Sequence, residues 1–202
     1  MSSQLILIAV TAVLKDLLEN GLVESAAIMS SLGDLKVTTQ PPDRISVGTD
    51  DQTQLNLFLY QMTQNRNADW IAQKRRNRNQ SVENPGSEKP PLGLNLHYLL
   101  TAYGSKDFQT EWILGHAMQV LRDMQITRDT IDRSLKHIAD NTDGFLAQAL
   151  AKTSITDLCE QIGEIKIYPK FFNTEEMSKL WSFLHASYRP SIAYEVSTVL
   201  ID

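Results

Sequence analysis

The chain has 202 residues, 42% of them hydrophobic and 21% charged, a balance typical of a folded globular protein with one domain, residues 1–202. The formal net charge of -5 and the pI near 5.4 argue against a protein that binds nucleic acid through a basic surface. The single cysteine, Cys159, excludes an intrachain disulfide and a cysteine-rich zinc site, and it fits synthesis in a reducing cytoplasm.

The N-terminal segment is apolar, but it lacks the pattern of a signal peptide or a membrane span. No basic residue precedes the apolar run from Leu5 to Val10, and Lys15 and Asp16 follow well before the roughly 20 residues that a span needs. Apolar side chains recur at helical spacing, at Ile6, Ala9, Val10, Val13, Leu14 and Leu17. We therefore expect a buried helix and no direct membrane insertion.

Extended segments come next in the chain. A short strand is expected within 35–45, where Pro41 and Pro42 end it because proline cannot continue a ladder. Residues 53–64 and 92–104 are both expected to be strands, and 53–64 is largely apolar on both faces, so that it is expected to be central. Its two faces are predicted to be Leu55, Leu57 and Leu59 on one side and Asn56, Phe58, Tyr60 and Met62 on the other.

Between these strands, the segment 65–91 is rich in Asn, Arg, Gly and Pro and has no apolar periodicity. A loop of this length inside a compact domain is usually functional or mobile. The two strands are therefore predicted to form an extended hairpin that flanks a long excursion.

Two helices are expected in the third quarter of the chain. Asp107 is the expected N-cap of a helix over 108–124. The core positions of that helix are expected to be Trp112, Leu114, Ala117 and Leu121. A second helix is expected to begin near Thr127 and to end in the turn-forming residues 139–144.

The last quarter returns to strands around one further helix. A strand is predicted through Ile162, Glu164, Ile165 and Ile167, closing before Pro169. Asn173 and Glu176 are spaced as a capping box and open a helix that contains Leu180, Trp181 and Leu184. The final strand begins at Pro190, where the missing backbone donor is tolerated. The whole pattern predicts an α+β fold, a mostly antiparallel sheet of about four strands packed with helices.

Motifs that carry chemistry are absent from the sequence. No phosphate-binding glycine pattern follows a strand and no His-Glu-x-x-His occurs. We interpret His97 and His116 as packed or hydrogen-bonded structural histidines. His137 with Asp140 and Asp143 could form a metal cluster. The alternative is that His137 lies at the end of a helix and the aspartates lie in a turn, which are positions where these residue types are common. The sequence therefore predicts no catalytic residue, metal or cofactor.

A basic cluster is the strongest local charge signal. It consists of Arg66, Lys74, Arg75, Arg76 and Arg78, with only Asp69 opposing it. The cluster either contacts an acidic surface or keeps a solvated loop soluble, and both interpretations stay open. Nucleic acid is not expected, because Trp70 is the only aromatic residue there that could stack on a base.

Three stretches resemble one known family, namely "PPLGLNLHYLLTAYG" at 90–104, "LGHAMQVL" at 114–121 and "EEMSKLWSFLHASYRPSIAYEVSTVLID" at 175–202. In this order they resemble the cap, or tail-terminator, proteins of phage-tail-like contractile injection systems of the Photorhabdus virulence cassette and antifeeding-prophage type. The last stretch is the most specific.

The resemblance implies a structural role and a phage tail-terminator-like fold. Proteins of this family form a hexameric ring on the baseplate-distal end of the tube and sheath, stop polymerisation and fix particle length. The implied partners are five further copies of the chain and the tube and sheath proteins, in a particle assembled after cytoplasmic synthesis. Some relatives carry a further C-terminal domain, whereas this chain ends at Asp202 and is expected to be a minimal form.

The C-terminal corner supplies the residues expected to matter for architecture. Trp181, Tyr188, Pro190 and Tyr194 are expected to hold the turn between the last helix and strand, with Trp181 packed on Tyr194. Arg189 is expected to bridge to a carboxylate within a ring. The strand "SIAYEVSTVLID" either belongs to the sheet of its own subunit, which we favour, or adds to the edge of a partner sheet.

A different class of function remains as the alternative. A small α+β enzyme or ligand-binding module would place its site under the 65–91 loop and would use His97 and Tyr103. No spacing of residues supports a particular reaction there.

Overall fold

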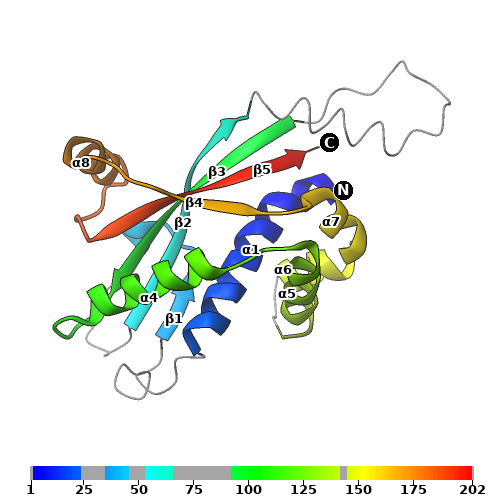
Figure 1. Cartoon of the computed structure of the whole chain (residues 1–202), viewed down its shortest axis with the longest axis horizontal. Coiled ribbons are helices and arrows are strands. Elements are labelled where there is room, and N and C mark those ends of the chain that lie inside the picture. The colour runs from blue at the N-terminus through cyan, green and yellow to red at the C-terminus, as the bar shows by residue number, and fades with distance from the viewer. Residues whose placement is uncertain (1, 24–34, 46–52, 66–91, 142–144, 202) are drawn as a thin grey trace.

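The computed structural model describes residues 2–23, 35–45, 53–65, 92–141 and 145–201, and the statements below concern these residues (Figure 1). They form an α+β fold in which a group of helices covers one face of a mixed sheet. The sheet has five strands within the described ranges, in the order β1-β2-β3-β5-β4. The predicted fold class is confirmed, with five strands instead of about four.

The strands are β1 (Leu35–Thr38), β2 (Thr53–Gln64), β3 (Leu92–Tyr103), β4 (Lys166–Lys170) and β5 (Ser191–Ile201). β1 is parallel to β2, and the other neighbours are antiparallel. The predicted hairpin of β2 and β3 is confirmed. β5 pairs with β3 on one side and β4 on the other, so the C-terminal strand belongs to the sheet of its own subunit, as favoured from the sequence.

The α-helices of the described ranges are α1 (Ser2–Val23), α4 (Gln109–Asp123), α5 (Arg128–Asn141), α6 (Phe145–Ala151), α7 (Ile155–Ile162) and α8 (Thr174–Phe183). α1 packs against β1 and β5 of the sheet and against α4, α5 and α7. It is therefore the helix that joins the sheet to the other helices. No helix in the described part of the chain has the length and apolar character of a membrane span.

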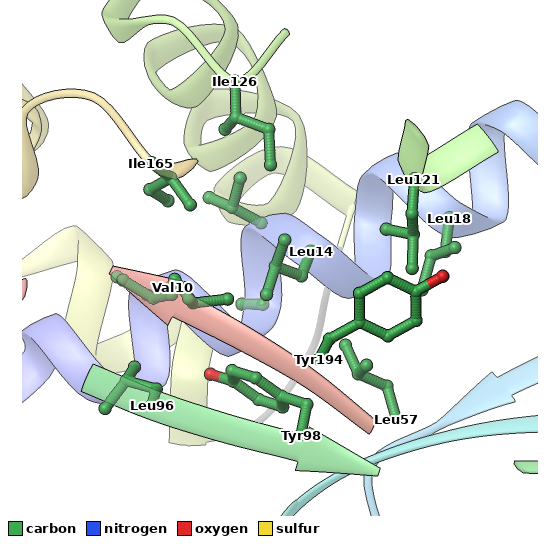
Figure 2. Packing of buried hydrophobic residues seen from close by; sticks show 14 of the residues in the cluster. Val10, Leu14, Leu18, Leu57, Leu96, Tyr98, Leu121, Ile126, Ile165 and Tyr194 are labelled. Atoms are coloured by element: carbon green, nitrogen blue, oxygen red, sulfur yellow. The ribbon is translucent and has the colours of Figure 1, made fainter. Parts of the chain in front are cut away.

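The core lies between α1 and the sheet (Figure 2). Its buried side chains include Val10, Leu14, Leu18, Leu57, Leu96, Tyr98, Leu121, Ile126, Ile165 and Tyr194. Burying a side chain the size of leucine contributes about 1.5–3 kcal/mol each. Tyr98 is fully buried, and its hydroxyl is satisfied by the hydroxyl of Thr11 on α1, at 2.8 Å.

Close approach of α1 and α4 depends on one glycine. A Cβ atom added at Gly21 would lie 2.6 Å from Cγ1 of Val120, which is shorter than van der Waals contact. The absence of a side chain at this position in α1 therefore sets how near the two helices pack.

The two faces of β3 differ in what covers them. Leu94, Leu96, Tyr98, Leu100 and Ala102 belong to the core or pack against it beneath α1. The alternate residues of β3 lie on the opposite face, hereafter the outer face, and they are Asn95, His97, Leu99, Thr101 and Tyr103. α8 lies on the outer face, because its Trp181 donates a hydrogen bond to Ser191, the β5 residue that pairs with Thr101.

A bulge changes the predicted faces of β2. The register against β3 shifts between Leu59 and Gln61, so one residue of β2 is left without a partner in the ladder. Beyond the bulge, Thr63 lies on the outer face with Phe58, because its hydroxyl contacts His97. Met62 was expected on the face of Phe58, and this prediction is wrong.

The predicted N-cap of α4 is also wrong. The N-cap position is held by Phe108, whose φ of 65° is left-handed and which makes no side-chain capping bond. The turn before α4 is instead held by Gln109, whose Oε1 accepts hydrogen bonds from the backbone N–H groups of Ser105 and Lys106. Asp107 therefore does not cap the helix.

A helix replaces the first part of the strand predicted around Ile165. Ser154 accepts a hydrogen bond from the backbone N–H of Asp157 and opens α7, and Gly163, with φ of 72°, ends it. Ile162 is thus the last residue of a helix. Pro169, expected to lie beyond the strand, is inside β4, which is tolerated because β4 is at the edge of the sheet.

A buried carboxylate joins α1 to α5. Asp16 is only 6% exposed, and its Oδ2 accepts a hydrogen bond of 2.6 Å from the Ser134 hydroxyl. Its Oδ1 lies 2.8 Å from Nδ1 of His137. Both carboxylate oxygens therefore have partners, as a buried charge requires.

We predict that Asp16→Ala lowers the free energy of unfolding by about 1–3 kcal/mol, because the buried polar partner Ser134 loses its acceptor. The neighbouring change Lys15→Ala removes only a partly exposed ion pair with Glu19 and is expected to cost less than about 1 kcal/mol. Urea unfolding followed by circular dichroism measures both. Equal losses in the two variants would contradict a structural role of the Asp16 contacts.

Candidate interaction surface

The predicted interface residues fall into two groups. The basic cluster of Arg66, Lys74, Arg75, Arg76 and Arg78 lies within 66–91, outside the described residues, and its role stays a prediction. The residues of the C-terminal corner are all described, and α8 meets β5 at one end of the sheet (Figure 1).

Trp181 and Tyr188 form the corner itself. The Trp181 side chain is buried, and its Nε1 donates to the hydroxyl of Ser191 at 3.3 Å. The Tyr188 ring meets the Trp181 ring edge-on with a centroid distance of 6.0 Å, while Tyr188 itself remains 65% exposed. The predicted capping box of Asn173 and Glu176 is present at the start of α8 and fixes where this helix begins.

Tyr194 does not take part in that corner. Its side chain belongs to the core beneath α1 and lies on the opposite face of β5 from Ser191 (Figure 2). The expected packing of Trp181 on Tyr194 is therefore wrong. Pro190 precedes β5 and is exposed.

Arg189 lies over an aromatic ring. Its guanidinium carbon is 5.1 Å from the centroid of Tyr103, the last residue of β3, which is a cation–π arrangement. Tyr103 is 3% exposed, and its hydroxyl has no hydrogen-bond partner among the described residues. Burial raises the pKa of Tyr103, and the Arg189 charge opposes that rise. The phenol is therefore a neutral donor at physiological pH.

A hollow of about 370 Å³ opens beside this pair, and we call it the corner groove. It is lined by Pro42, Asp43, Ile45, Tyr103, Trp181, His185, Ala186, Ser187 and Arg189. Four of the nine lining residues are polar or charged, namely Asp43, His185, Ser187 and Arg189, and the others are aromatic or aliphatic. His185 is held in the left-handed region, with φ of 51°, at the turn after α8.

A second polar cluster lies further along the outer face, and we call it the outer-face network. Asn65 donates to Oδ1 of Asn95 at 3.0 Å, and Asn95 donates to Oε1 of Glu195 at 2.8 Å. Nζ of Lys170 lies 3.5 Å from Oε2 of the same glutamate. These contacts join β2, β3, β5 and β4 beside the point where the 65–91 excursion leaves the sheet.

His97 lies within this network and is 3% exposed. Its Nε2 lies 2.8 Å from the Thr63 hydroxyl, and its Nδ1 lies 3.8 Å from Oε2 of Glu195, too far for a hydrogen bond. Burial lowers the pKa of His97, Lys170 lowers it further, and Glu195 acts in the opposite direction. The neutral imidazole is therefore favoured in the folded protein.

The residues of the alternative enzyme hypothesis are not brought together. His97 and Tyr103 share the outer face of β3 but are six residues apart, a span of about 20 Å along a strand. The two side chains therefore cannot contact one small substrate at the same time.

Two further histidines, His116 and His137, have structural contacts. His116 stacks on Trp112 with a centroid distance of 5.2 Å, and His137 contacts Asp16. Among the described residues no group of three or more His, Cys, Asp or Glu could hold a metal ion, while Asp143 lies outside them. Burial raises the pKa of the Cys159 thiol to about 11, which leaves it protonated at neutral pH.

The family model of the Pvc16 N-terminal domain matches residues 9–202. The chain belongs to this family. The match confirms the resemblance to caps of Photorhabdus virulence cassette type that the sequence motifs indicated. No curated protein matches the chain.

Two solved structures are similar to this member of the Pvc16 N-terminal domain family. One is described as the PVC sheath/tube terminator of an extracellular contractile injection system in its extended state, with 13% identity and a TM-score of 0.44, covering 90% of this chain. The other is described as the anti-feeding prophage cap, a tube terminating cap, with 14% identity and a TM-score of 0.43, covering 87% of this chain. The chain spans 56% and 51% of their respective lengths.

We predict that Trp181→Ala lowers the free energy of unfolding by about 3–5 kcal/mol, because it empties a buried aromatic site. Phe183→Ala, two residues further along the same helix, removes a side chain that is 75% exposed and should change stability by less than about 0.5 kcal/mol. Chemical denaturation of the two variants compares them directly. A small loss for Trp181→Ala would contradict its role in holding the corner.

We also predict a pH-dependent stability difference between the wild type and His97→Gln. Because the folded pKa of His97 lies below its ordinary value of 6.5, the unfolded chain binds the proton more readily. The neutral His97 side chain therefore contributes fully to the free energy of unfolding above pH 6.5. This contribution is lost as the pH falls from 6.5 through the lower pKa of the folded protein.

Denaturation of both proteins between about pH 8 and pH 5 measures this difference, since the two chains differ only at position 97. The wild type should lose more stability on acidification than His97→Gln, in which the amide can keep a bond to Thr63. Parallel curves would show that His97 is not neutral and buried in the folded chain.

Proposed function

We propose that this chain is a structural cap of a contractile injection particle. Six copies form a ring on the baseplate-distal end of the tube and sheath, stop polymerisation there and so fix the particle's length. Membership in the Pvc16 N-terminal domain family carries this proposal. In this proposal the chain acts as a single domain, residues 1–202. Its partners are the tube and sheath proteins of the particle, which it joins after synthesis in the cytoplasm. Neither nucleic acid binding nor membrane insertion has a role.

The edges of the sheet support the proposal. A terminal subunit must contact the layer below it without offering a new edge to further strands. One edge strand of the sheet, β4, carries Lys166, Pro169 and Lys170. Charged residues and proline at an edge both disfavour the addition of a further strand. The opposite edge strand, β1, has only four residues.

The exposed aromatic side chains of the corner also favour a role in assembly. Phe183 and Tyr188, at the end of α8 and in the turn that follows, are 75% and 65% exposed. Aromatic residues are enriched at protein interfaces, where they bury a large area with few rotatable bonds. A structural ring places such surfaces between subunits.

Deletion of the gene tests the proposal by negative-stain imaging of purified particles. We expect tubes or sheaths of uncontrolled length with open ends, and normal lengths when the wild-type chain is supplied in trans. Light scattering on the purified chain, alone and with tube and sheath proteins, should find an assembly of six 22.8 kDa subunits. Particles of normal length and intact ends in the deletion strain would overturn the proposal, and an accompanying metabolic defect would favour the enzyme.

A further inference from the structure

The corner groove has the chemistry of a site for a carboxylate. Arg189 is partly buried at the groove and makes a cation–π contact with Tyr103, and none of the described carboxylates forms an ion pair with it. Asp43 lines the same hollow but is not paired with this guanidinium. An unpaired guanidinium beside low-dielectric walls binds a carboxylate more strongly than one in open solvent.

A second, independent observation points to a missing partner. Tyr103 is only 3% exposed, and its hydroxyl is buried. This hydroxyl has no hydrogen-bond partner in the described part of the chain. A buried donor without an acceptor costs about 1–3 kcal/mol. An acceptor brought into the groove by another segment, next to Arg189, would remove that cost.

The accessible lining of the groove offers both polar and apolar groups to a partner. Arg189 is only partly buried there and is a residue type enriched among the side chains that dominate the binding energy of protein interfaces. Ile45 adds a partly exposed aliphatic side chain to the lining. The groove therefore suits a protein segment that presents one carboxylate to Arg189.

The opposite end of the molecule carries exposed carboxylates. Asp157 on α7 and Glu164, just after it, are exposed and form no ion pair with the described residues, whereas Glu160 between them is paired with Arg128. β4 begins after α7 and ends before α8, and these two helices lie at opposite ends of the strand (Figure 1). Asp157 and Glu164 belong to the α7 end, whereas the groove residues Trp181 and His185 belong to the end where α8 lies. A ring of identical subunits joins two such different surfaces, head to tail.

We infer that the corner groove binds the α7 end of a neighbouring copy of this chain, with a carboxylate of Asp157 or Glu164 on Arg189. Tyr103 then donates its hydroxyl to the incoming segment. The inference rests on the proposed ring, and it assigns the two surfaces that close it.

The Arg189→Lys variant tests the inference by zero-length carbodiimide cross-linking in assembled particles. The lysine keeps the charge and supplies an amine that couples to a carboxylate in contact with it. We expect Lys-to-carboxylate cross-links from position 189 to Asp157 or Glu164, with a band of two chains on a denaturing gel. Within one chain these positions are separated by the length of β4, about 17 Å, so the link must join two copies.

Two controls come from the chain itself. Lys179 pairs with Glu175 on the same helix, so this link should form within one chain in every sample. Arg44→Lys introduces the same change at an exposed residue of the short 3-10 helix η1 (Pro42–Arg44), close to the groove but not lining it, and should give no link to α7. Cross-links from position 189 to tube or sheath proteins alone, or to no neighbouring copy, would overturn the inference.

Charge reversal gives an independent measurement. Arg189→Glu should reduce the fraction of chains in assemblies at least tenfold in sedimentation velocity, and adding Asp157→Arg with Glu164→Arg should restore most of it. Unchanged melting temperatures show that the variants fold. Assembly that is insensitive to Arg189→Glu would overturn the inference.

The inference and the proposed function can fail separately. If the deletion strain has particles of uncontrolled length but position 189 forms no cross-link, the cap function is supported and the groove is not the contact between subunits. If the deletion strain has particles of normal length but position 189 forms the expected cross-link, the subunit contact is supported and the cap function is rejected.

Discussion

The burial of α1 is the constraint on which the rest of the structure depends. This helix lies on the sheet and also touches α4, α5 and α7, so nearly its whole circumference must be apolar or paired. The one acidic side chain that it buries, Asp16, is accepted only because α5 presents Ser134 and His137 to it. Satisfying that carboxylate therefore holds α1 and α5 together at this point.

The two faces of the sheet differ in composition and in what covers them. Its inner face is apolar and holds α1, whereas the outer face carries a polar network around His97 and Glu195 and is covered by α8 only at one end. Polar contacts among the described residues of the outer face connect β2, β3, β5 and β4 near Asn65. The proposed subunit contact uses the end of the sheet and leaves this network free.

Local patterns in the sequence predicted much of the fold. The capping box of Asn173 and the final strand were correct because each depends on neighbouring residues, and the hairpin was correct because β2 and β3 are successive long strands. The helix α7 was missed, although Ser154 and Gly163 bracket it and its buried residues recur at helical spacing. The link from Asp16 to Ser134 and the bond from Asn95 to Glu195 join residues 118 and 100 positions apart, and no local pattern records such partners. The corner groove could not be predicted for the same reason.

The contact of Gly21 with Val120 constrains how this sequence can vary. The two positions, on α1 and α4, share one small volume, and a methyl group added at the first already collides with the second. A bulkier residue at 21 is therefore compatible with the same helix spacing only where 120 becomes smaller. Related sequences that keep this architecture should show coupled substitution at the pair, with total side-chain volume conserved across both sites.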